Sequence, residues 1–182
     1  MCQRVCESPN EFEAVHAQLK TTACPHCKSF GNLIRHGYLR GYDKENRQAR
    51  TVRGWRIYCS KRGRATGCGR TFSVWWASKV KRLFLTVEQL WDFLKHAARS
   101  GNKMQAFRRL NSGLSSSAPY RIWNRFLAAQ SAIRTALHRK CEPPKSTARQ
   151  PAEHTLAHLE AAFRDHSCPI AAFQIWLQAS FM

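Results

Sequence analysis

The sequence CSKRGRATGCGRTF spans residues 59–72, and CPHC occupies residues 24–27. In the shorter stretch two residues separate Cys24 from Cys27, a spacing that lets both thiolates bind one zinc ion. Eight residues separate Cys59 from Cys68, where roughly two to four are usual, but the insertion is basic and contains glycine. It can therefore loop out and leave the two sulfurs adjacent. These four cysteines predict one structural Zn²⁺ site, closed by four thiolates and without an open position for water.

Three segments around the cysteines predict β-strands, because aromatic and β-branched residues alternate in them. The first runs through residues 33–39 with an interruption at His36-Gly37, the second covers residues 51–58 and the third residues 71–76. A polar turn at residues 41–46 joins the first two strands. We call each cysteine pair with its intervening turn a knuckle. The order knuckle, two strands, knuckle, strand is typical of a zinc ribbon, a small sheet whose folding depends on its metal.

Other potential metal ligands are present. Cys2 and Cys6 form a second pair with three residues between them, so a second metal site near the N-terminus stays an alternative. His26 lies within the first knuckle and His36 within the first predicted strand, and either could replace a cysteine. We expect both histidines to face solvent instead.

The second half of the chain predicts three helices. Thr86 and Gln89 form a capping box ahead of an apolar helical face that ends at Ser100-Gly101. A short helix over residues 103–110 follows, and a longer one begins at Ser117 and runs to Lys140. Two helices joined by a turn that contains glycine, the second of them basic, favour a helix-turn-helix. The alternative is an ordinary three-helix bundle whose polar side chains face water.

The fold class predicted is α+β: a small zinc-ribbon sheet, a helix-turn-helix bundle and a C-terminal helical hairpin. Three prolines in a short polar stretch indicate a linker before the hairpin. The hairpin is too small to fold alone, so we expect it to pack on its own chain, on a second copy or on another protein. The predicted parts are an N-terminal segment 1–20, the ribbon 21–80, the helix-turn-helix 84–140, the linker 141–151 and the hairpin 152–182.

The charge is strongly positive and unevenly distributed. The net charge is +19, and the region 21–150 alone carries 27 basic and 5 acidic residues. Such a surface favours a polyanionic partner, and arginine in particular suits phosphates and guanine edges. We therefore expect double-stranded DNA as the partner. With no long apolar run and no signal-peptide core, we expect a cytoplasmic, nucleoid-associated protein and no membrane contact.

Residues predicted to contact nucleic acid fall into two groups. At the start of the third helix, side chains are expected to reach bases or phosphates in the major groove. These are Ser116, Ser117, Tyr120, Arg121 and Asn124, with Arg108, Arg109 and Arg125 on backbone phosphates. In the ribbon and its basic loop, cations are expected to hold the phosphate backbone or enter a groove. These are Arg40, Arg47, Arg50, Arg53, Arg56, Lys61, Arg62, Arg64 and Arg70.

The succession of CPHC, a basic sheet, GCGRTF and a helix-turn-helix resembles the N-terminal DNA-binding region of bacterial insertion-sequence transposases. The resemblance covers residues 22–127 and departs from those ribbons in its longer Cys59–Cys68 spacing. It implies recognition of transposon ends or operators. Those transposases continue into a ribonuclease-H-like domain with three metal-binding carboxylates. Only four acidic residues follow residue 127 here, so we expect no strand cleavage.

We therefore expect a non-enzymatic, sequence-selective DNA-binding protein of a mobile element, whose residues 152–182 recruit a nuclease, a recombinase or a second copy. One alternative is a dimeric transcription regulator unrelated to transposition. Another is an RNA-binding ribbon whose aromatic side chains stack on unpaired bases. Those side chains would be Tyr38, Trp55, Tyr58, Trp75 and Trp76. An enzyme is disfavoured, because neither clustered carboxylates nor an open metal site are present in the sequence.

Overall fold

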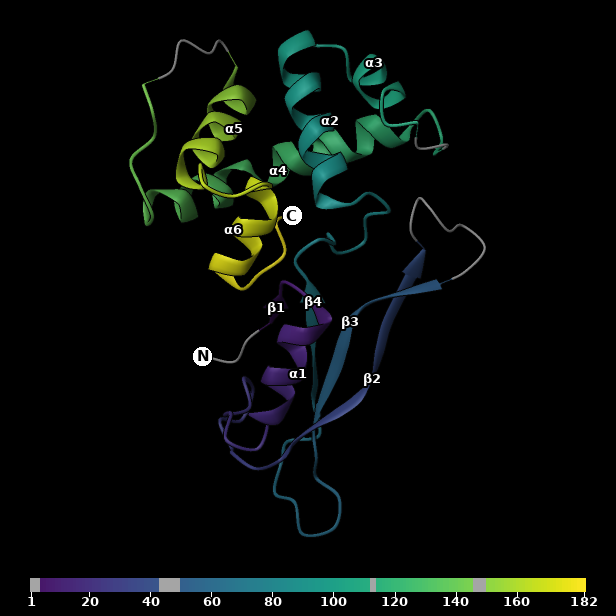
Figure 1. The fold of residues 1–182 in the computed structure, drawn as a ribbon, viewed down its shortest axis with the longest axis vertical. Coiled ribbons are helices and arrows are strands. Elements are labelled where there is room, and N and C mark those ends of the chain that lie inside the picture. The colour runs from purple at the N-terminus through teal and green to yellow at the C-terminus, as the bar shows by residue number, and fades with distance from the viewer. Residues whose placement is uncertain (1–3, 43–49, 112–113, 146–149) are drawn as a thin grey trace. The chain divides into compact units, whose positions relative to one another are not determined.

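The computed structural model describes residues 4–42, 50–111, 114–145 and 150–182. Within these ranges the chain has a mixed α+β fold with one four-stranded sheet and six helices (Figure 1). It divides into two compact units, Met1–Lys79 with the sheet and Val80–Met182 with most of the helices. No helix in the described ranges is long and apolar enough to cross a membrane.

The sheet of the first unit has the strand order β1-β4-β3-β2. Its main part is a long antiparallel hairpin of β2, Leu33–Tyr42, and β3, Arg50–Cys59, as Figure 1 shows. Strand β4, Thr71–Trp76, pairs antiparallel with β3. All three strands were predicted, but β2 is not interrupted at His36-Gly37. A bulge there shifts the register and lets the strand continue.

The N-terminal segment belongs to the same unit. Strand β1, Val5–Cys6, pairs in parallel with β4, and helix α1, Pro9–Ala17, starts at a Ser8 cap. The ring of Phe12 is fully buried and stacks on Trp55 with centroids 5.1 Å apart and planes 10° apart. The sequence analysis places residues 1–20 in a segment of their own. In the structure, Cys6, Phe12 and Leu19 belong to the same core as the sheet.

The second unit starts with three helices. Helix α2, Val87–Ser100, has the predicted capping box between Thr86 and Gln89 and ends at Gly101 in the left-handed region, with φ of 67°. Helix α3, Lys103–Arg108, and helix α4, Ala118–His138, each end two residues earlier than predicted. Ser117 occupies the N-cap position of α4, but its side chain makes no capping hydrogen bond.

The C-terminal hairpin consists of α5, Pro151–Ala162, and α6, Pro169–Leu177. Helix α5 contacts α2 and α4, and α6 contacts α2. The apolar side chains of the hairpin are buried in one core with those of α2 and α4. The largest of them are Leu156, Leu159, Phe163, Ile170 and Phe173. Of the three packing partners considered, the hairpin thus uses its own chain.

Candidate metal centre and nucleic-acid interface

The structure brings the sulfurs of Cys24, Cys27, Cys59 and Cys68 within 4.8 Å of one another. The Sγ atoms of Cys24 and Cys68 are 3.9 Å apart, and those of Cys27 and Cys59 are 3.8 Å apart. Four sulfurs around an ion at about 2.3 Å in a tetrahedron would be separated by about 3.8 Å. The donor set and its spacing therefore fit one four-coordinate metal ion.

Both knuckles direct a backbone N–H to the sulfur of their first cysteine. In the first, the backbone N–H of His26 donates to the sulfur of Cys24 at 3.4 Å. In the second, the N–H of Cys68 donates to the sulfur of Cys59 at 3.4 Å. Each knuckle then turns through a residue with positive φ, Lys28 at 63° and Gly69 at 71°. The backbone thus directs an N–H toward one thiolate in each pair, which stabilises the negative charge of the sulfur.

The long spacing of the second knuckle is accommodated as a closed loop. The N–H of Gly67 donates to the carbonyl of Ser60 at 2.8 Å and so closes the insertion at its base. A Cβ on Gly67 would lie 2.1 Å from that carbonyl oxygen and 2.7 Å from the sulfur of Cys59. Only glycine fits there. The sequence indicated only that the insertion contains glycine, and the requirement at Gly67 was missed.

The exposed thiol of Cys27 and the buried thiol of Cys59 have opposite pKa shifts. Hydrogen bonding with Ser29, whose Oγ lies 3.0 Å from the sulfur, lowers the pKa of the exposed Cys27 to about 6. Burial raises the pKa of Cys59 to about 11, because a thiolate there loses contact with water. A bound cation would compensate that charge and favour the thiolate.

The alternative ligands do not join this cluster. His26 and His36 are exposed, and the ring of His36 packs beside Tyr58 at 5.3 Å. Cys6 is a fully buried side chain of β1, and its burial raises its pKa to about 12; Cys2 lies outside the described residues. In the described ranges, Cys24, Cys27, Cys59 and Cys68 form the only group that could hold a metal ion.

At the start of α4 the predicted contact residues lie on one face. Ser117, Tyr120, Arg121 and Asn124 follow a spacing of three and four residues, and all four are exposed, as is Ser116 ahead of the helix. Leu127 continues this face and is 44% exposed. On and next to α3, Arg108 and Arg109 are also exposed. The structure thus leaves this group of predicted contacts accessible.

Arg125 is an exception. Its Nη2 donates hydrogen bonds to the backbone carbonyls of Lys81, at 2.9 Å, and Met182, at 2.5 Å. Burial, together with the nearby charge of Arg82, lowers the pKa of Arg125. Its guanidinium therefore holds distant chain segments together, which leaves it fewer donors for a phosphate, and its predicted contact stays a prediction.

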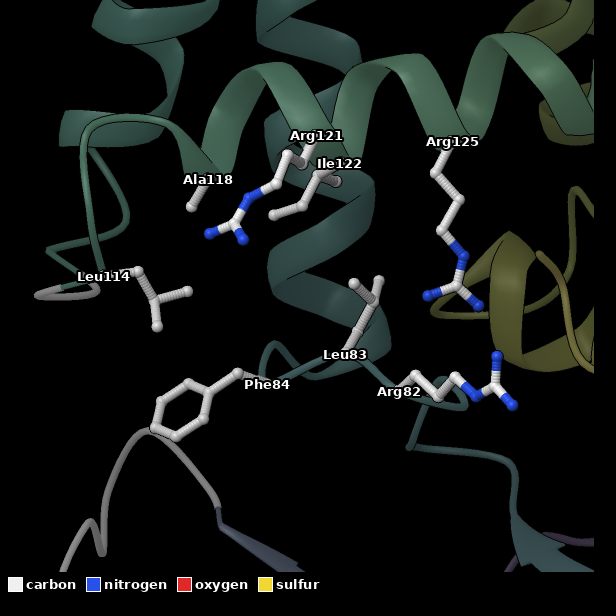
Figure 2. A pocket seen from close by; sticks show the side chains of 8 residues that line it. All are labelled: Arg82, Leu83, Phe84, Leu114, Ala118, Arg121, Ile122 and Arg125. Atoms are coloured by element: carbon white, nitrogen blue, oxygen red, sulfur yellow. The ribbon is translucent and has the colours of Figure 1, made fainter.

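A pocket of about 310 Å³ in the second unit is lined in part by Arg82, Arg121 and Arg125. In Figure 2, Arg121 extends from α4 toward Leu114, whereas Arg125 extends toward Arg82. Arg121 also donates a hydrogen bond to the hydroxyl of Ser115 at 3.3 Å. The rest of the lining is apolar, consisting of Leu83, Phe84, Leu114, Ala118 and Ile122.

Most of the predicted cations of the first unit are accessible, with two departures. The exposed ones are Arg40, Arg50, Arg56, Lys61, Arg62, Arg64 and Arg70. Arg53 is only 7% exposed and its side chain lies against Gly41, so this arrangement does not offer it to nucleic acid. Arg47 lies outside the described residues.

The aromatic residues considered for base stacking divide by burial. Trp55 and Trp76 are 8% and 6% exposed and belong to the core, so they cannot serve as stacking surfaces. Trp75 and Tyr58 are half-buried, whereas Tyr38 is 51% exposed. Tyr42, which sequence reasoning missed, is 44% exposed. The alternation of Tyr38, Arg40 and Tyr42 was the signal that could have identified it.

Comparison with known proteins returned no relatives: no protein-family model, curated protein or solved structure matches the chain.

Proposed function

We propose that the chain is a zinc-dependent, non-enzymatic, sequence-selective DNA-binding protein of a bacterial mobile element. In this proposal the first unit is a zinc ribbon, and α3 and α4 form a helix-turn-helix that recognises a transposon end or an operator. The observation that carries it is the exposed face of Ser117, Tyr120, Arg121 and Asn124 at the N-terminal end of α4.

The chemistry of that face suits the major groove. The first turns of a recognition helix are the part that reaches base edges. Arginine pairs with the O6 and N7 atoms of guanine, and asparagine with the N6 and N7 atoms of adenine. Arg121 and Asn124 supply both groups on one exposed stripe, while Ser116 and Ser117 suit phosphate contacts.

The charge supports a nucleic-acid partner. Thirty arginine and lysine side chains stand against eleven aspartate and glutamate side chains, so at least nineteen of these cations have no carboxylate of the chain to pair with. Described pairs include Arg35–Glu13 and Lys95–Glu160. Counterion release from a phosphate backbone would then contribute much of the affinity.

Zinc has a structural role in this proposal. The four thiolates of Cys24, Cys27, Cys59 and Cys68 would leave a zinc ion no open position for a water nucleophile. The ion would fasten the knuckles at the base of the β2–β3 hairpin. Partner recruitment through residues 152–182 would depend on the outer surface of α5 and α6, because their apolar side chains are buried against α2 and α4.

The test is the affinity of the zinc-loaded protein for duplex DNA selected from a random pool, measured by fluorescence anisotropy at two salt concentrations. Arg121→Gln should weaken binding about 5- to 150-fold and reduce the salt slope by about one. Arg164→Gln makes the same charge change just after α5 and should change affinity less than twofold. Equal effects of the two substitutions would rule out α4 as the recognition helix. A palindromic selected site bound by a dimer would favour the transcription-regulator alternative.

A further inference from the structure

Strand β2 presents an alternation of arginine and tyrosine on one face of the sheet. Tyr38 pairs with Trp55, Arg40 with Val52 and Tyr42 with Arg50, and residues directly opposite on adjacent strands share a face. Arg35, opposite Ile57, lies on the same face. We call Arg35, Tyr38, Arg40, Tyr42 and Arg50 the Tyr–Arg row.

The inner end of the row is anchored in the core. Phe12 stacks on Trp55 at 5.1 Å, and Trp55 in turn contacts the ring of Tyr38 at a centroid distance of 4.1 Å. Phe12 and Trp55 are buried, whereas about half of Tyr38 is exposed. The buried stack therefore ends in an accessible ring that is already held in place. Such a ring loses little conformational entropy when a ligand stacks on it.

Arginine accompanies each aromatic ring. The guanidinium carbon of Arg40 lies 5.4 Å from the centroid of Tyr38, and that of Arg50 lies 5.5 Å from Tyr42. Both distances are near the outer limit of about 6 Å for a cation–π contact. The Nε of Arg50 also donates a long hydrogen bond to the hydroxyl of Tyr42, at 3.4 Å. A flat group that stacks on either ring would displace its guanidinium. Neither Arg40 nor Arg50 forms an ion pair with an acidic residue that the structure describes.

We propose that the Tyr–Arg row binds an unpaired nucleic-acid strand, with bases stacked on Tyr38 and Tyr42 and phosphates held by Arg40 and Arg50. Base–aromatic stacking needs a free base face, which an unpaired strand offers and a duplex covers with its neighbouring pairs. Arg35 pairs with the carboxylate of Glu13 at 3.2 Å, and it also lies 4.3 Å from the ring centroid of Trp55. It orders the inner end of the row.

This site uses residues other than those of α4, so it goes beyond the proposed duplex recognition. The same chemistry fits DNA and RNA, since both have stackable bases and phosphates. A protein with both sites could hold a duplex and an adjacent melted strand together.

The experiment uses the full-length, zinc-loaded protein and three labelled probes: an unstructured 12-nucleotide DNA, the RNA of the same sequence, and the corresponding DNA duplex. The double substitution Tyr38→Ala and Tyr42→Ala should weaken single-strand binding at least tenfold and change duplex binding less than twofold. The double substitution to phenylalanine retains the rings and should bind as the wild type does. Phe30→Ala removes an exposed aromatic ring of the same unit that lies outside the row, and it should leave single-strand binding unchanged.

The outcomes separate the two proposals. Unchanged single-strand affinity of the double alanine variant would overturn the proposal that the row binds an unpaired strand. An equal loss of affinity for single strand and duplex, with zinc content preserved, would overturn it as well. Row-dependent binding of either single strand supports it, and a tenfold preference identifies DNA or RNA as the ligand. If the protein binds no duplex but still binds single strands through the row, duplex recognition fails and the row stands.

Discussion

The backbone N–H of Cys68 donates a hydrogen bond to the sulfur of Cys59 at 3.4 Å, although eight residues separate these cysteines. In the short knuckle the sulfur of Cys24 accepts a backbone N–H at the same distance, but the donor is His26, which lies between the two cysteines. In both pairs the sulfur of the first cysteine thus accepts a backbone hydrogen bond, which stabilises a thiolate.

Replacing a cluster cysteine should abolish stoichiometric metal binding. The purified protein should contain one zinc per chain by elemental analysis, and Cys59→Ser should contain far less, because three thiolates leave the site open. Chelation should unfold the sheet unit while the helical circular dichroism of the second unit persists. Cys141→Ser, at a half-exposed cysteine outside the cluster, is the control. A full zinc content in Cys59→Ser would contradict the assignment.

Gly67→Ala should weaken zinc binding at least tenfold, measured by competition with a chromophoric chelator. The added Cβ would lie 2.1 Å from the carbonyl oxygen of Ser60, so the loop would open and displace Cys59 or Cys68. Gly63→Ala is the matched control in the same loop. No atom lies within 4 Å of a Cβ built at Gly63, although its φ of 60° makes alanine cost about 1 kcal/mol. Similar zinc affinities for the two variants would contradict this role of Gly67.

Arg121 and Arg125 are one turn apart on α4, but their substitutions should affect different properties: DNA affinity for Arg121 and the free energy of unfolding for Arg125. Arg125→Gln should lower the free energy of unfolding by about 1.5 to 3 kcal/mol per hydrogen bond lost, because two backbone carbonyls lose a charged donor. Arg121→Gln should change stability by less than about 0.5 kcal/mol but weaken DNA binding. Denaturant unfolding followed by circular dichroism checks the first expectation. A stability loss in Arg121→Gln that exceeds that of Arg125→Gln would refute this division.

Phe12→Ala tests whether the N-terminal segment is part of the sheet unit. Since Phe12 is fully buried against Trp55 and Trp76, we expect a loss of about 3 to 5 kcal/mol, seen as a lower unfolding midpoint by tryptophan fluorescence. Phe30 is 65% exposed, and Phe30→Ala should have little effect. Equal midpoints for the two variants would mean that α1 does not stabilise the sheet.

The parts of the fold that the sequence predicted depend on short-range patterns. The cysteine pairs, the three strands and the capping box of Thr86 and Gln89 each involve a few neighbouring residues whose chemistry restricts the backbone. The four cysteines are brought together as expected, close enough to hold one metal ion. The exposure of Arg121 and Asn124 likewise follows from the period of one helix.

The parts that were missed depend on contacts between distant residues. Arg125 is half-buried and held by carbonyls 44 and 57 residues away. Strand β1 has only two residues and is specified by its parallel pairing with β4. Arg35 and Arg50 share a face with Tyr38, Arg40 and Tyr42 only because register shifts at Arg35/Gly37 and Leu39/Arg40 compensate odd steps along the strands. No local periodicity reveals such a shift.

The hydrogen bond between Gly67 and Ser60 also has a practical consequence. It closes the second knuckle at its base. The number of residues between 61 and 66 can therefore change without moving the sulfurs of Cys59 and Cys68. That segment is therefore a suitable insertion point. A short reporter peptide placed there would extend the loop without changing the positions of the four sulfur ligands. Homologous chains could differ in loop length at this point and still bind the same ion.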